Sequence, residues 1–246
     1  MTAGRPPQLG KLDIVKILAR RFGYRTYLEI TTGLTGGIYP AARRSGFETC
    51  RRIVYRQDVK PADDGEPVDY PVGGEDIADA IARIRADGPT FDVIMVDAHH
   101  TYACAIRDIA ASFALVRDGG ALVVHDCDPP DADLARPDFV EGPWCGVTYK
   151  AFLDFVRDND DLFYVTVDTD YGCGVVFKGR RRGIREWLAH RRAGMRSAAG
   201  ERALTAAWRE VGDDFAAAFA MLRGNRKRLL RLMSPRRFTS VYGKPA

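Results

Sequence analysis

The sequence predicts an α/β protein with a doubly wound, mainly parallel sheet. Short apolar runs alternate with segments whose apolar residues repeat at helical spacing, a pattern typical of β-α-β units. Two of the apolar runs, residues 91–96 and 121–125, lead directly into acids and histidines. Because charged groups are costly inside a buried strand, we expect these polar ends at the crevice where such sheets bind ligands.

Helices and strands are expected to alternate along the first 180 residues. The expected helices are residues 11–21, 76–87, 103–116 and 148–157, and the expected strands are residues 26–30, 51–55, 91–96, 121–125, 163–167 and 174–178. The last two strands flank a turn at Tyr171 and Gly172, which predicts an antiparallel hairpin at the edge of the sheet. Residues 126–146 form a long loop, and since long loops are usually functional, this one is a candidate substrate lid.

Charge and apolar spacing set the C-terminal residues apart. Residues 178–246 carry 18 Lys and Arg against 5 Asp and Glu, whereas the first 177 residues carry 19 against 28. Apolar residues at steps of three and four from Leu204 to Leu222 predict one long helix, whose apolar face packs on the sheet or joins two copies of the chain. We therefore expect a body, residues 1–180, and a basic helical extension, residues 181–246.

Length and composition narrow the classes of protein. A chain of 246 residues suits one sizeable domain with a terminal extension. No apolar run approaches the roughly 20 residues that a membrane-spanning helix needs, and the first residues lack a signal-peptide core. The five cysteines are scattered without close pairing or metal-ligand spacing. These features predict reduced thiols, a cytoplasmic location and no membrane partner.

Five segments, in order, resemble class I S-adenosylmethionine-dependent methyltransferases. They are YLEI with the glycine turn after it, FDVIMVD with HTY, GGALVVHDCDPP, GPWCGVTYKAFLDFVR and VDTDYGCGVV. More narrowly, the chain is similar to small-molecule O-methyltransferases with D-G-x-H-x-Y and H-D-x-x-P-P segments, from about residue 26 to 178 and again over residues 225–238. The resemblance implies a Rossmann-like fold and methyl transfer to a hydroxyl of a small, sugar-bearing metabolite, as in natural product biosynthesis.

The resemblance also implies where S-adenosylmethionine binds. The expected cofactor-binding residues are Glu29, Thr31, Gly33, Gly36, Gly37, Asp58 and Asp97. Glycines after a first strand let a cofactor approach the main chain closely. Thr31 departs from the family pattern because it stands where the first glycine usually is. No acid directly ends the second strand, so Asp58 is the candidate for the ribose hydroxyls.

On the acceptor side, the two acids at neighbouring strand ends are the candidate metal ligands. Asp97 and Asp126 offer the oxygen ligands that Mg²⁺ prefers. His100 matches the family histidine and is the first candidate for general base, because imidazole accepts a proton near neutral pH. His125 is a further ligand or base. Two readings stay open, since Asp97 could instead orient the cofactor's amino group and either histidine could be structural.

Two other functions compete with a small-molecule methyltransferase. Thr31 and Thr35 in the glycine turn motivate a degenerate methyltransferase fold that serves as a binding or assembly protein. The basic extension motivates a nucleic-acid methyltransferase. The chain has no basic cluster interleaved with aromatic residues and no nucleic-acid motif, which makes nucleic acid the less favoured partner.

Overall fold

The computed structural model of the chain describes residues 9–32, 37–56, 64–74, 76–97, 99–159, 161–179 and 198–244. The helices are α1 (Lys11–Phe22), α2 (Tyr39–Arg43), α3 (Ala78–Asp87), α4 (Tyr102–Leu115), α5 (Thr148–Asp158), α7 (Ala198–Glu210), α8 (Phe215–Leu229) and α9 (Pro235–Tyr242). The strands are β1 (Thr26–Thr31), β2 (Thr49–Val54), β3 (Tyr70–Pro71), β4 (Phe91–Asp97), β5 (Val116–Val124), β6 (Phe163–Val167), β7 (Cys173–Phe177) and β8 (Leu232–Met233).

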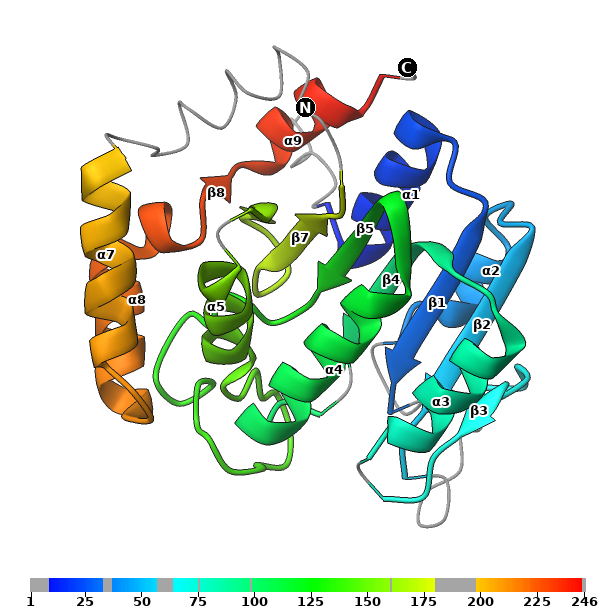
Figure 1. The fold of residues 1–246 in the computed structure, drawn as a ribbon, viewed down its shortest axis with the longest axis horizontal. Helices are drawn as coiled ribbons and strands as arrows, with labels where there is room; N and C mark the ends of the chain where they lie inside the picture. The colour runs from blue at the N-terminus through cyan, green and yellow to red at the C-terminus, as the bar shows by residue number, and fades with distance from the viewer. Residues whose placement is uncertain are drawn as a thin grey trace, which may run out of the picture.

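The strands form one eight-stranded sheet in the order β3-β2-β1-β4-β5-β7-β6-β8 (Figure 1). The five strands from β3 to β5 are parallel, β7 is antiparallel to both of its neighbours, and β8 is parallel to β6. This arrangement confirms the predicted doubly wound, mainly parallel sheet and its antiparallel hairpin. The two-residue strand β8 extends the sheet beyond the hairpin, and the sequence analysis missed it.

The register of the central strands brings three of them to a common edge. Thr31 of β1 pairs with Asp97 of β4. Val96 pairs with Val124 of β5, and the amide of His125 donates to the carbonyl of Val96 at 3.0 Å. The acids and histidines that follow β4 and β5 therefore start at the same level, at the carboxyl ends of the strands where such sheets bind ligands.

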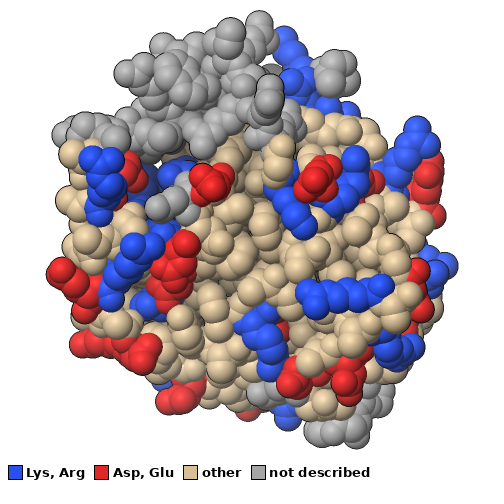
Figure 2. All heavy atoms as spheres, in the orientation of Figure 1, with Lys and Arg blue, Asp and Glu red and all other residues tan. Residues whose placement is uncertain are grey.

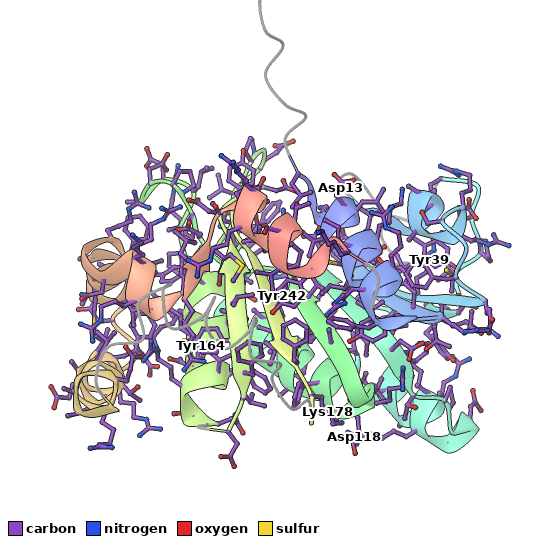
Figure 3. The ribbon with its side chains drawn as sticks, turned by 90° about the horizontal axis from the view of Figure 1, so that it is seen from above. Asp13, Tyr39, Asp118, Tyr164, Lys178 and Tyr242 are labelled. Carbon is purple, nitrogen blue, oxygen red and sulfur yellow. The ribbon has the colours of Figure 1, made fainter. Side chains whose placement is uncertain are left out.

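Helices cover both faces of the sheet, as the view from above shows (Figure 3). On one face, α1, α2 and α9 enclose a core that includes Ile14, Tyr39 and Phe238. On the other face, α3, α4 and α5 enclose a second core, to which α7 and α8 contribute Trp208 and Leu222. Because both faces are covered, the central strands are apolar along most of their length.

The prediction of one long C-terminal helix is wrong. Helix α7 ends at Glu210, and Gly212 follows with a φ of 58°. This left-handed backbone conformation cannot continue a right-handed helix, and glycine adopts it at little cost. Asp214 then caps α8 by accepting a hydrogen bond from the amide of Ala217 at 2.9 Å. The expected apolar face nevertheless exists, and Leu204 on it is buried. The boundary at residue 180 stays a prediction.

Several basic residues of the extension pair with acids of the body. Arg226 contacts both Asp128 and Asp168 at 2.5 Å, and Arg209 contacts Asp158 at 3.1 Å. On the face seen in Figure 2, basic and acidic side chains are interspersed. These contacts favour an extension that packs on an acidic body. The acids of the body then neutralise part of the positive charge of the extension. Among the described residues, no helix is long and apolar enough to cross a membrane.

We predict that replacing Trp208 by alanine lowers the free energy of unfolding by about 3–5 kcal/mol. The indole is completely buried, and its Nε1 donates to Asp154 Oδ1 at 2.7 Å. Chemical denaturation followed by circular dichroism measures the effect. Arg202→Ala is the matched control on the exposed side of the same helix and is expected to change stability by less than about 0.5 kcal/mol. Small and equal effects of both substitutions would contradict this packing.

Candidate active site

Four of the predicted site residues come together at the ends of β4 and β5. His100 Nε2 lies 3.3 Å from Asp126 Oδ2 and 3.6 Å from Asp97 Oδ1. His125 Nδ1 lies 3.3 Å from Asp97 Oδ1 and 3.3 Å from Asp126 Oδ1. Two carboxylates and two imidazoles thus form one largely buried cluster of ionisable side chains.

His100 is oriented by the loop that the sequence analysis identified as a candidate lid. Its Nδ1 lies 2.7 Å from the carbonyl oxygen of Trp144. Because a carbonyl only accepts hydrogen bonds, Nδ1 carries a hydrogen and the other nitrogen, Nε2, faces the carboxylates. Gly146 allows this contact, since its φ is 59° and a Cβ there would lie 2.3 Å from the His100 carbonyl oxygen.

The pKa of His100 is raised above its ordinary value. Burial lowers this pKa, but the negative charges of Asp97 and Asp126 outweigh burial. Asp126 is nearly completely buried and has a φ of 59°, which is uncommon for a residue with a side chain. This sharp turn directly after β5 places the Asp126 carboxylate beside His100, and strain of this kind is frequent at functional sites.

His125 has a different environment from His100. The residue is 7% exposed, and Nε2 lies 3.4 Å from Asp170 Oδ1 on the side away from Asp97. Burial lowers the pKa of His125, but Asp97, Asp126 and Asp170 raise it well above its ordinary value. In this arrangement the ring is a cation among three carboxylates, which is a poor state for a base. Its predicted catalytic role stays a prediction.

Lys11 and Asp170 belong to the site but were not predicted. The Lys11 ammonium forms an ion pair with Asp97, and the Lys11 amide donates to Asp170 Oδ2 at 3.1 Å. Burial raises the pKa of Asp97, but His125, His100 and Lys11 hold it well below its usual range. Asp170 lies in the VDTDYGCGVV segment, which signalled its presence without a role. Nothing in the sequence signalled Lys11.

The donor set fits a divalent cation. One ligand atom each from Asp97, His100 and Asp126 lie within 4.8 Å of one another. Two carboxylates with one imidazole suit Mg²⁺ or Mn²⁺, which prefer oxygen ligands and keep bound water. Lys11 already neutralises one oxygen of Asp97, so a cation would share this carboxylate with the ammonium.

The cofactor side is organised around Glu29, which is 1% exposed. Its Oε2 accepts a hydrogen bond from the Tyr27 hydroxyl at 2.6 Å, and its Oε1 accepts one from the Ile38 amide at 3.0 Å. A Cβ at Gly37 would lie 3.1 Å from Glu29 Oε1 and 3.3 Å from Thr31 Oγ1. Glu29 therefore holds the chain where it returns from the turn, and Gly37 is needed for this close approach. Burial raises the pKa of Glu29 to about 7.

Three of the predicted cofactor-binding residues, Gly33, Gly36 and Asp58, lie outside the described residues. Thr31 is buried and pairs with Asp97. The turn therefore begins directly beside the acids of the acceptor side. Asp97 is the point where the two halves of the predicted site meet.

Comparison with known proteins gives a family match over part of the chain. Residues 63–127, which contain Asp97, His100, His125 and Asp126, match the model of a family described as a methyltransferase domain. A search of curated proteins gives no match.

Solved structures of two O-methyltransferases are similar to part of the chain. The O-methyltransferase TomG from Streptomyces achromogenes, involved in tomaymycin synthesis and solved with S-adenosylmethionine, is 18% identical with a TM-score of 0.50, over 69% of this chain and 80% of that one. An O-methyltransferase from Bacillus cereus, solved with S-adenosylhomocysteine, is 16% identical with a TM-score of 0.48, over 68% of this chain and 80% of that one. The family match agrees with the enzyme class expected from the sequence, a methyltransferase, and the TomG structure shares the fold.

Titration of Glu29 is expected to make folding stability depend on pH. The folded pKa of about 7 exceeds the ordinary value of 4.5, so between these pH values the folded chain holds a proton that the unfolded chain has lost. The free energy of unfolding should therefore fall by about 3 kcal/mol as pH rises through this window. Glu29→Gln, which resembles the protonated acid, should remove this part of the pH dependence in denaturation experiments.

Glu48→Gln is the matched control for this prediction, because its carboxylate is exposed and pairs with Arg25. Its pH profile should parallel that of the wild type. A constant difference in stability between the wild type and Glu29→Gln from pH 4 to pH 8 would show that burial does not shift Glu29.

Proposed function

We propose that the protein transfers a methyl group from S-adenosylmethionine to a hydroxyl of a small acceptor. One observation carries the proposal. The turn anchored by Glu29 and the cluster of Asp97, His100 and Asp126 meet at adjacent strand ends, so a methyl donor and a base would face each other there. The family match to a methyltransferase domain supports the same activity.

In the proposed reaction, His100 Nε2 takes the proton of the acceptor hydroxyl. The hydroxyl oxygen forms a bond to the methyl carbon while the bond from that carbon to sulfur breaks, which leaves S-adenosylhomocysteine and the methyl ether. The Trp144 carbonyl keeps Nε2 turned toward the site, and Asp126, at 3.3 Å, stabilises the imidazolium that forms. Alignment of the reacting atoms would supply most of the acceleration.

Asp97 and Asp126 would hold Mg²⁺ in this proposal. A bound divalent cation makes a neighbouring hydroxyl more acidic and offsets the negative charge that raises the pKa of His100. The neutral imidazole would then be the form that accepts the proton. The close approach of the two carboxylates supports this assignment and leaves His100 Nε2 for proton transfer, while Lys11 limits how many oxygens of Asp97 a cation could take.

Aromatic side chains beside the site support a sugar-bearing acceptor. Among the described residues, the large hydrophobic side chains that are exposed are Phe139, at 63%, and Tyr171, at 46%. The Phe139 ring packs on Trp144, which contacts His100, and the Tyr171 ring lies 6.4 Å from the ring of His125. Exposed rings next to carboxylates suit a small molecule with both apolar faces and hydroxyl groups.

Two alternative functions are a methyltransferase fold that has lost cofactor binding and a nucleic-acid methyltransferase. Thr31 Oγ1 lies close to Gly37 and adds bulk to the turn, which supports a degenerate fold without cofactor binding. A nucleic-acid methyltransferase would show a steep salt dependence of RNA or DNA binding. The pairing of Arg226 and Arg209 with acids of the body argues against that function for the described part of the extension.

We predict that His100→Ala lowers the rate of methyl transfer by about 10²–10⁴-fold, because it removes the proposed base. Release of S-adenosylhomocysteine in the presence of a panel of glycosylated and phenolic acceptors measures the rate. Affinity for S-adenosylmethionine should be nearly unchanged, since His100 lies on the acceptor side. His99→Ala is the matched control for loss of an imidazole that packs on the same Trp144 ring, because the His99 ring contacts Thr101 and Trp144. Equal rates in wild type and His100→Ala would remove the assigned role.

A further inference from the structure

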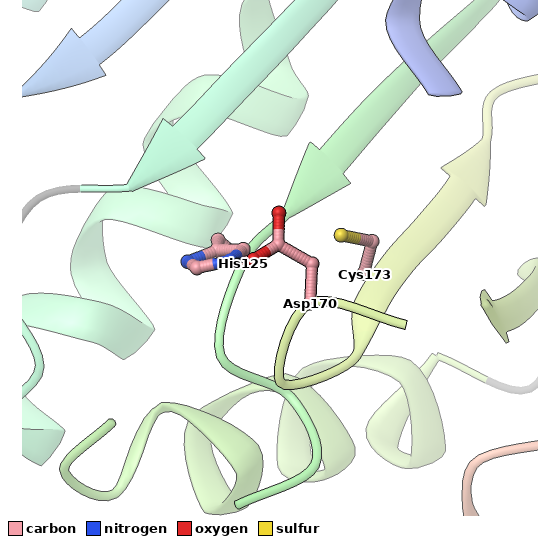
Figure 4. Close-up of side chains that lie close together, drawn as sticks. All are labelled: His125, Asp170 and Cys173. Carbon is pink, nitrogen blue, oxygen red and sulfur yellow. Dashed lines mark ion pairs between the residues drawn. The ribbon is translucent and has the colours of Figure 1, made fainter. Parts of the chain in front are cut away.

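A second group of metal-ligating side chains lies on the far side of His125. One ligand atom each from His125, Asp170 and Cys173 lie within 4.8 Å of one another. His125 follows β5, Asp170 lies in the turn of the β6–β7 hairpin, and Cys173 begins β7. Figure 4 shows the three side chains gathered between the end of β5 and the start of β7.

The imidazole of His125 lacks hydrogen bonds at both nitrogens. The two atoms are buried, and their contacts with carboxylates at 3.3–3.4 Å fall outside hydrogen-bond geometry. A buried polar atom without a hydrogen bond is costly even beside a charge of opposite sign, so these two nitrogens call for an explanation. Nε2 points toward Asp170, and a metal ion between them would satisfy this nitrogen.

The other two side chains are available as ligands. The Lys11 amide occupies Asp170 Oδ2, which leaves Oδ1 turned toward His125. Cys173 is completely buried, and burial raises the pKa of its thiol to about 12. The Cys173 Sγ lies within 4.8 Å of ligand atoms of His125 and Asp170, and a metal ion bound there would lower the pKa of the thiol, so that Cys173 would bind as the thiolate.

We propose that His125, Asp170 and Cys173 form a binding site for a thiophilic divalent cation, in the first place Zn²⁺. A sulfur, a nitrogen and an oxygen ligand are the donors that Zn²⁺ takes in proteins, and three protein ligands leave a fourth position for water. The neighbouring cluster of Asp97, His100 and Asp126 is richer in oxygen and suits a harder cation. The two clusters would therefore bind different metals.

Occupation of this second site would act on the candidate active site through His125. With Nε2 bound to the metal, the ring keeps a hydrogen on Nδ1, which faces Asp97 and Asp126 at 3.3 Å. A carboxylate–histidine–metal arrangement of this kind fixes both the ring and the carboxylate. The proposal goes beyond methyl transfer, because the site needs neither cofactor nor acceptor.

Titration of the reduced protein with Co²⁺ tests the proposal, because only a cysteine ligand gives a thiolate-to-cobalt charge-transfer band. We expect this band in the wild type and its loss when Zn²⁺ displaces Co²⁺. Cys173→Ser should abolish the band, and Asp170→Asn should shift the titration to higher Co²⁺ concentration. Cys145→Ser is the matched control, since this buried cysteine lies beside Asp126 of the other cluster, and it should keep the band.

Two results would overturn the proposal. One is the absence of a thiolate band in the wild type. The other is a band that is lost in Cys145→Ser and kept in Cys173→Ser, which would place the metal in the cluster of Asp97, His100 and Asp126. Circular dichroism reports whether Cys173→Ser is folded. If it is not, Asp170→Asn decides, because its partly exposed side chain is replaced without loss of volume, and an unchanged titration would contradict the site.

Discussion

Compensation of the charge of Asp97 is the constraint on which the candidate site depends. The carboxylate ends a buried strand and is met by Lys11 from α1, His100 from the segment after β4 and His125 from the end of β5. An isolated buried carboxylate would cost several kcal/mol, so each of these partners is fixed by the need to neutralise it. The contacts join elements that are distant in the sequence, and they position the groups that would react.

The two histidines of the site are separated in role by their partners. His100 is held by a backbone carbonyl at one nitrogen, which turns the other nitrogen, the proposed base, toward Asp126. His125 lies between carboxylates on both sides, at 3.3 Å from Asp97 and 3.4 Å from Asp170. The surroundings of an imidazole set its stable protonation state. His100 is therefore suited to the proposed proton transfer, and His125 to a structural or metal-binding role.

The parts of the molecule that sequence could predict are those set by local pattern. The apolar runs of β4 and β5 predicted the sheet. The acids that follow these runs predicted the edge of the sheet that holds the site, and with it the cluster of Asp97, His100 and Asp126. Lys11 and Asp170 escaped prediction because only tertiary packing brings α1 and the β6–β7 hairpin to Asp97. The break at Gly212 escaped because a helical apolar stripe looks the same whether one helix or two carry it, and strand β8 escaped because two residues are too few to show an alternating pattern.

Methyl transfer by this chain requires a working cofactor site beside Asp97, and the most direct measurement is calorimetry of S-adenosylmethionine binding with and without Mg²⁺. The departure at Thr31 makes this measurement decisive, because a threonine stands where the family has its first glycine, and its Oγ1 would lie 3.3 Å from a Cβ at Gly37. The account predicts binding in the micromolar range in both conditions. Absence of binding in both would contradict it and would leave a methyltransferase fold that has lost its activity.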